Sequence, residues 1–200
     1  MAAELEELLG FLSSPSPPVK KAAVDIVRDY TGSEDGLQML GKCCGVLLPS
    51  LSRLLAEKKE VSEPAAEALV NLSQNSDLAK KMVDTGVVET AMQILYKENC
   101  EITGLLVMLL VNLTQLDAGI DSLLQSGDEK MKGLYIMKLV RSFCTSSSER
   151  RGLLIRLSLT KLNQVLQHMG PRKLLLYLRK IMLNSYSTKL QITHLFPLLL

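Results

Sequence analysis

The sequence predicts an all-α protein built from a stack of similar helical units. Leucine and alanine carry most of the predicted packing, because the chain is 47% hydrophobic but only 4% aromatic and has no tryptophan. The segment ALVNLSQ, at positions 68–74, returns as LLVNLTQ, at positions 109–115, so that Asn71 and Asn112 are one period apart. Gly45, Gly86 and Gly127 keep the same spacing of 41. Two markers in phase at one period predict a repeat array.

The unit between the two asparagines divides into three predicted helices. Asn75-Ser76-Asp77 supplies N-cap chemistry for a short helix over about residues 78–85. Gly86 can take the left-handed conformation that ends this helix. A second helix is predicted over about residues 87–97, with apolar side chains on one face. The third, over about residues 101–115, is apolar nearly all round, as expected of a helix packed between neighbours.

The preceding unit follows the same plan. Its first helix is predicted to start at Asp35 and to end at Gly45, and its second covers residues 47–55. Pro64 is expected in the first turn of the third helix, where a proline is tolerated, and this helix ends at Gln74.

The start of the chain is predicted to cap the array. Residues 4–12 suit the last helix of a truncated cap, and three prolines then make a rigid turn into a helix over residues 19–30. Asp29-Tyr30-Thr31 precedes Asn71-Leu72-Ser73 by almost the same period, a spacing of 42, and so occupies the same place in an earlier unit.

A unit of this length, with a short helix, a second helix and a long helix, resembles the armadillo repeat. The segments LVNLS, residues 69–73, and LVNLT, residues 110–114, resemble its third-helix signature. One such unit cannot bury its faces alone, so the units stack, and the third helices line a groove. The expected fold is an all-α, armadillo-like right-handed α-solenoid of about three to four three-helix repeats.

Longer segments resemble the Hgh-type armadillo-like family. They are LSSPSPPVKKAA (12–23), EPAAEALVNLSQ (63–74), LLVMLLVNLTQLDAG (105–119) and YIMKLVRSFC (135–144). The resemblance covers residues 1–148. It implies a cytosolic adaptor that assists the folding of translation elongation factor 2 together with the cytosolic chaperonin. Two domains are therefore expected, a repeat array over residues 1–148 and a divergent basic tail over residues 149–200.

The tail differs in charge from the rest of the chain. Residues 1–150 carry 21 acidic and 15 basic residues, whereas the last fifty carry eight basic residues and no acidic one. Residues 153–169 and 172–183 could form basic amphipathic helices. Three interpretations stay open: a splice or frame product that makes this a truncated isoform, a degenerate last repeat, or a segment that binds nucleic acid or an anionic membrane.

Four residues are candidate protein-binding residues: Asn71, Gln74, Asn112 and Gln115. Armadillo proteins that bind extended peptides use an asparagine ladder on their third helices, with a tryptophan four residues before each asparagine. Glu67 and Met108 occupy those earlier positions here. The asparagines could instead bridge neighbouring helices within the stack. Acidic residues between positions 57 and 67 form either a solvated helix face or a docking patch for a basic partner.

No catalytic, cofactor-binding or metal-binding residues are predicted. Both histidines, His168 and His194, lie in the tail, and the sequence has no phosphate-loop, dinucleotide or metalloprotease motif. The four cysteines lack metal-ligand spacing and suit core positions in a reducing compartment. The longest apolar run, residues 105–111, is too short to span a membrane, and the acidic start of the chain does not resemble a secretory signal.

The predicted function is therefore a non-enzymatic protein-binding scaffold in the cytoplasm or also in the nucleus. By resemblance, its partners are translation elongation factor 2 and the cytosolic chaperonin. No small-molecule substrate and no membrane span are predicted, and nucleic acid is not the expected partner. The alternative is an armadillo adaptor that binds extended peptides in nuclear transport or signalling.

Overall fold

The computed structural model describes residues 2–97, 100–125, 127, 128, 131, 134, 135 and 138. The chain forms two compact units, Met1–Lys132 and Gly133–Leu200. The predicted tail over residues 149–200, its boundary at residue 148 and its basic helices lie outside the described residues.

Within the described part, nine α-helices and no strands are found, and all nine lie in the first unit. The all-α prediction is therefore confirmed for this part of the chain. The helices are α1 (Ala2–Phe11), α2 (Pro17–Tyr30), α3 (Glu34–Lys42), α4 (Cys44–Leu54), α5 (Lys59–Leu72), α6 (Ser76–Asp84), α7 (Val87–Leu95), α8 (Thr103–Leu113) and α9 (Asp117–Leu124).

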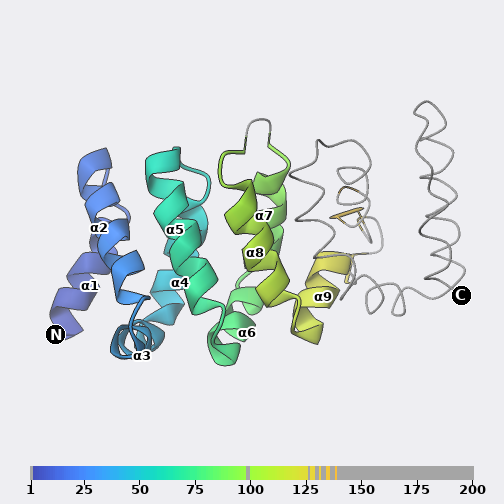
Figure 1. Ribbon diagram of the computed structural model, residues 1–200, viewed down its shortest axis with the longest axis horizontal. Coiled ribbons are helices and arrows are strands. Elements are labelled where there is room, and N and C mark those ends of the chain that lie inside the picture. Colours follow the sequence, from blue (N-terminus) through green and yellow to red (C-terminus); the bar gives the residue numbers. More distant parts are fainter. Residues whose placement is uncertain are drawn as a thin grey trace, which may run out of the picture. The chain divides into compact units, whose positions relative to one another are not determined.

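The helices repeat in groups of three. α3, α4 and α5 form one complete repeat, α6, α7 and α8 form the next, and α2 and α9 belong to the repeats on either side. The third helices α2, α5 and α8 stand side by side, with α5 packed on both of the others (Figure 1). The short helices α3, α6 and α9 lie along one edge of this row (Figure 1). The arrangement agrees with the period of the sequence markers.

The core consists of aliphatic side chains that the repeats present to one another. Each third helix buries several of them, and α5 is covered so fully that only its polar stripe stays accessible. Six large side chains that are less than 2% exposed illustrate this packing across three helices: Leu47, Leu48, Leu51, Leu69, Leu72 and Leu109. Burying a leucine stabilises a fold by roughly 1.5–3 kcal/mol, so these contacts dominate the stability of the stack.

The predicted start and end of the first helix in the better-marked repeat are confirmed. The Asn75 side chain accepts hydrogen bonds from the backbone N–H groups of Asp77, at 3.0 Å, and Leu78, at 3.1 Å. These two groups would otherwise lack a partner at the start of α6. Gly86 has φ 77° and separates α6 from α7, which suits a residue without a Cβ.

The prediction that Gly45 ends a helix in the same way is wrong. α3 already ends at Lys42 and α4 begins at Cys44, so Gly45 lies in the first turn of α4. Cys43, with φ −106° and ψ 15°, is both the C-cap of α3 and the N-cap of α4. The connection from α3 to α4 therefore needs no left-handed residue. Gly86 is the only glycine with positive φ among the described residues.

The predicted position of Pro64 is also wrong. α5 begins at Lys59, so Pro64 is its sixth residue and lies inside the helix. The helix starts earlier because the carbonyl of Lys58 accepts hydrogen bonds from Val61, at 3.0 Å, and Ser62, at 2.9 Å. Pro64 has no N–H to donate to the carbonyl of Glu60. Glu60 is exposed, so water can hydrogen-bond this carbonyl instead.

Gly119 lies against the end of the preceding repeat, and a substitution there tests how closely α8 and α9 approach. A Cβ at Gly119, near the start of α9, would lie 2.1 Å from the backbone oxygen of Leu113. We expect Gly119→Ala to lower the free energy of unfolding by roughly 1–3 kcal/mol, because the backbone must move to relieve the overlap. Gly104→Ala on α8 is the matched control, since nothing lies within 4 Å of its added Cβ. Urea unfolding of both variants measures the difference, and equal stabilities would contradict the close approach.

Candidate functional site

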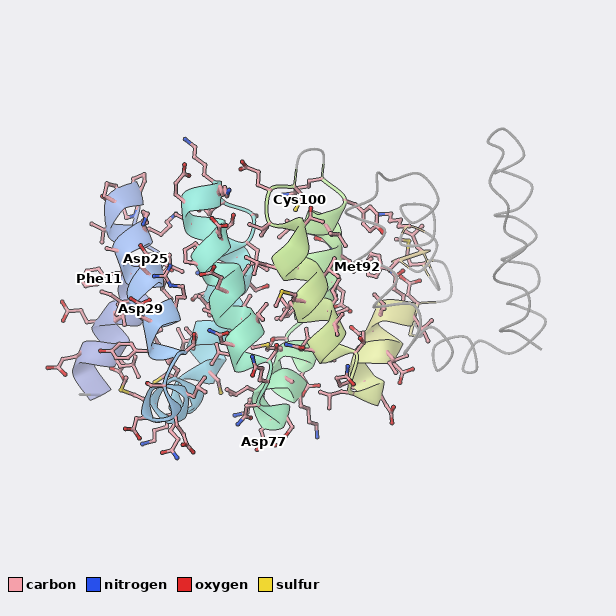
Figure 2. The ribbon with its side chains drawn as sticks, in the orientation of Figure 1. Phe11, Asp25, Asp29, Asp77, Met92 and Cys100 are labelled. Atoms are coloured by element: carbon pink, nitrogen blue, oxygen red, sulfur yellow. The ribbon has the colours of Figure 1, made fainter. Side chains whose placement is uncertain are left out.

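The third helices present a continuous face made of repeat-equivalent positions. Asp25 on α2, Glu67 on α5 and Met108 on α8 are equivalent, each one period after the one before. Asp29, Asn71 and Asn112 form a second such column. Each of these six side chains is half-buried or exposed, and Figure 2 shows the two aspartates one turn apart on α2. We call these two columns the third-helix face.

The two asparagines join successive repeats. The Nδ2 of Asn71 donates to the Oγ1 of Thr31, at the end of α2, over 2.9 Å. The Nδ2 of Asn112 donates to the Oγ of Ser73, at the end of α5, over 2.8 Å. One interaction is thus repeated across two repeat junctions, and each asparagine bridges neighbouring helices within the stack.

The hydroxyls that receive these bonds are themselves buried, and each also donates a hydrogen bond. Thr31 is 4% exposed and Ser73 is 5% exposed. Their hydroxyls donate back into their own helices, from Thr31 to the carbonyl of Arg28 over 2.5 Å and from Ser73 to that of Val70 over 2.7 Å. Thr114 repeats the pattern at the end of α8, where it donates to the carbonyl of Leu110 over 2.7 Å. These bonds run from the asparagine amide to the hydroxyl and from the hydroxyl to a helix carbonyl, and we call the series the asparagine–hydroxyl ladder.

The four candidate binding residues separate into two pairs. Asn71 and Asn112 are half-buried and have their Nδ2 atoms in the ladder. Gln74 and Gln115 are exposed at the C-terminal ends of α5 and α8, and Gln115 donates to the Val111 carbonyl of its own helix over 3.1 Å. Contact of all four residues with a partner stays a prediction. The sequence did not single out the hydroxyls of Thr31, Ser73 and Thr114, although each lies two residues after the Asn or Asp of its unit.

Arg28 organises the charges at the α2 end of the face. Its guanidinium lies 2.8 Å from Asp29, 3.4 Å from Asp25 and 3.8 Å from Glu67 of the next repeat. The side-chain hydrogen bond that Arg28 donates to Asp29, together with these carboxylate charges, raises the pKa of Arg28 against the opposing effect of burial. Arg28 therefore keeps its positive charge, and acidic side chains outnumber it in this part of the face.

No group of three or more potential metal ligands occurs among the described residues. Cys43, Cys44 and Cys100 are free thiols, while Cys144 and both histidines lie outside the described part. No helix in that part is long and apolar enough to cross a membrane. What the face provides is an ordered array of carboxylates, amides and one exposed methionine, which suits contact with another protein surface.

Sequence comparison gives two curated relatives, although no family model matches the chain. Both are called Protein HGH1 homolog. The protein from Dictyostelium discoideum is 25% identical over 146 residues, which are 73% of this chain and 41% of the relative. The protein from Schizosaccharomyces pombe is 30% identical over 113 residues, 56% of this chain and 32% of the relative. The resemblance to the Hgh-type family is confirmed over part of the chain. The chain spans less than half the length of these relatives.

Solved structures confirm the armadillo-like solenoid. A designed armadillo repeat protein in complex with the peptide (KR)4 has a TM-score of 0.64 and is 22% identical, with 94% of this chain and 80% of that chain covered. A computationally designed armadillo repeat protein for modular peptide recognition has a TM-score of 0.61 and is 20% identical, with 74% of this chain and 60% of that one covered. At such identity these likenesses show the fold alone.

The ladder makes a testable contribution to stability. Asn112→Ala removes the donor to Ser73, and we expect a loss of about 0.5–1.5 kcal/mol in the free energy of unfolding. The double variant Asn112→Ala and Ser73→Ala should lose less free energy of unfolding than the two single variants together, because both changes remove the same interaction. Gln115→Ala, at an exposed side chain, is the control and should change little. Urea unfolding of the single and double variants measures the coupling, and additive effects would argue against the bond.

Proposed function

We propose that this chain acts as a folding adaptor for translation elongation factor 2, together with the cytosolic chaperonin. The chain is a helical repeat scaffold, and this fold is typical of proteins without enzymatic activity. The observation that carries the finer proposal is the match to two HGH1 homologs, which extends over 73% and 56% of the chain. This role places the protein in the cytoplasm.

The third-helix face is the surface that we assign to the folding client. Its side chains are polar or only partly apolar, so it stays compatible with water when no partner is bound. Met108 is 49% exposed in the centre of α8 and gives the face an apolar contact beside the ladder. Flexible methionine side chains adapt to surfaces of different shape, which suits a client that is still folding. Binding of this kind uses complementary surface and needs no cofactor.

A binding measurement with purified elongation factor 2 tests this assignment. We expect the full chain to bind the factor, and Met108→Asp to weaken binding about tenfold, because it places a charge in a desolvated contact. Val46→Asp on α4 is the matched control, since Val46 is also exposed, at 61%, and belongs to the second helix of its repeat. Binding can be followed by sedimentation of the labelled factor. Absence of binding by the unaltered chain would refute the adaptor proposal.

A second candidate function is the binding of extended basic peptides. Asp25, Asp29 and Glu67 make the α2–α5 part of the face acidic, and Glu63 lies one turn before Glu67 on α5. One structural neighbour was solved with the basic peptide (KR)4. The ladder limits this candidate, because the Nδ2 atoms that would meet a peptide backbone already donate to Thr31 and Ser73. Nuclear transport or signalling would be the setting for such an adaptor.

Titration with the peptide (KR)4 separates the two candidates. If the chain is a peptide adaptor, the peptide binds, and the double variant Glu63→Lys and Glu67→Lys abolishes binding without changing the melting temperature. If the chain is a folding adaptor, we expect only weak binding that disappears at high salt, where exposed charges are screened beyond about 3 Å. Fluorescence anisotropy of the labelled peptide at low and high salt measures both outcomes.

A further inference from the structure

The end of the array formed by α1 and α2 exposes large apolar side chains. Phe11 on α1 is 43% exposed, and Val19, Ile26 and Tyr30 on α2 are 40%, 45% and 41% exposed. Val19, Ile26 and Tyr30 are spaced by seven and four residues, so they lie on one side of α2. Figure 2 shows Phe11 at the outer side of the array, beside α2. We call these four side chains the end patch.

The exposed side of α2 corresponds to a side that is buried between repeats on α5 and α8. Val19, Ile26 and Tyr30 have equivalents one repeat later on α5 and two repeats later on α8 and its N-cap. The corresponding side chains there are at most 7% exposed: Val61, Ala68, Leu72, Ile102, Leu109 and Leu113. Asn71, next to Leu72, donates to Thr31, the C-cap of α2, so this side of α5 faces the preceding repeat. The end patch therefore has the positions of a surface between repeats, exposed on α2.

The charges around the patch restrict what can cover it. Glu6 and Glu7 on α1 are exposed, and the side chain of Asp29 is 70% exposed at the position where Asn71 and Asn112 bridge repeats. The basic side chains of α2 are paired: Lys20 lies 2.7 Å from Glu57, and Lys21 lies 2.6 Å from Asp25. A second copy of the chain, meeting this end with the same end, would bring acidic groups together, which disfavours that pairing.

Asp29, the carboxylate at the position of Asn71 and Asn112, determines which hydrogen-bonding group the partner must present. Asn71 and Asn112 donate a hydrogen bond to the preceding helix, whereas the ionised carboxylate of Asp29 can only accept one. The partner must therefore present a donor here, and lysine or arginine makes the stronger, charge-assisted bond. Arg28 already occupies one oxygen of Asp29, at 2.8 Å, which orients the carboxylate.

We propose that the end patch binds an amphipathic helix of a partner protein, with apolar side chains on one face and lysine or arginine beside them. The helix packs across α2 in the place that the third helix of a preceding repeat would take. Apolar residues three, four or seven positions apart on the partner meet Val19, Ile26 and Tyr30, which is the usual pattern of helix recognition. This surface shares only Asp29 with the third-helix face, and it does not depend on the folding-adaptor proposal.

The chain itself supplies a probe of the right shape. The helix that packs on the equivalent side of α8 is α5, so a labelled synthetic peptide of residues 59–75 presents a matching face. Glu60→Lys, Glu63→Lys and Glu67→Lys in this peptide give it a basic flank, and the unsubstituted peptide is the matched control. We expect the basic peptide to bind the full chain about tenfold more tightly than the control, because it complements the acidic groups around the patch.

Variants of the full chain locate the binding site. Ile26→Asp should weaken binding of the basic peptide about tenfold, because it charges the centre of the apolar stripe. Val46→Asp, at an exposed apolar side chain elsewhere, should leave the affinity unchanged. Circular dichroism confirms that each variant is folded, and Ile26→Ala provides a milder truncation of the same side chain.

Three results would overturn the proposal. Equal affinities of the basic and unsubstituted peptides would remove the role of charge. Binding that survives both Ile26 variants would place the peptide elsewhere on the chain. A dimer in sedimentation equilibrium that Ile26→Asp dissociates would show that a second copy, and not a partner helix, covers the patch.

Discussion

The packing of each third helix on the next is the interaction on which the rest of this array depends. A single three-helix repeat is too small to cover its own apolar surface, so α5 is stable only with α2 on one side and α8 on the other. Aliphatic side chains supply most of the free energy of this contact. The asparagine–hydroxyl ladder adds direction, because a hydrogen bond from Asn71 to Thr31 requires one rotation and one offset between the helices.

The same packing decides which surfaces remain for partners. Stacking buries the two flanks of α5 and leaves a polar stripe, which joins the equivalent stripes of α2 and α8 in the third-helix face. Stacking also leaves one flank of α2 exposed at the end of the row, where side chains of repeat-interface type remain accessible. The two surfaces differ in chemistry: the first is mostly carboxylate and amide, and the second is apolar with acidic groups around it. They suit different kinds of protein contact.

Local chemistry predicts the structure correctly where one residue fixes the backbone by itself. Asn75 caps α6 with its own side chain, and Gly86 adopts the left-handed conformation that few other residues tolerate. Prediction fails where a neighbouring residue offers another solution. Cys43 makes the turn predicted at Gly45, and the carbonyl of Lys58, by accepting bonds from Val61 and Ser62, starts α5 a turn before Pro64. For Gly45 the periodic spacing is real but marks a position in the repeat, not a helix end.

The sequence by itself determined the repeat, its period and its helical content, because these follow from short-range patterns of apolar, capping and glycine residues. It also narrowed the role of the asparagines to two alternatives, a partner contact or a bridge between helices. Only the tertiary structure placed Asn71 against Thr31 and Asn112 against Ser73, since the members of each pair are far apart in the chain and meet through stacking. The end patch likewise became visible only in three dimensions. Val19, Ile26 and Tyr30 are large and mainly apolar, but whether such a side chain is buried depends on what lies next to its helix.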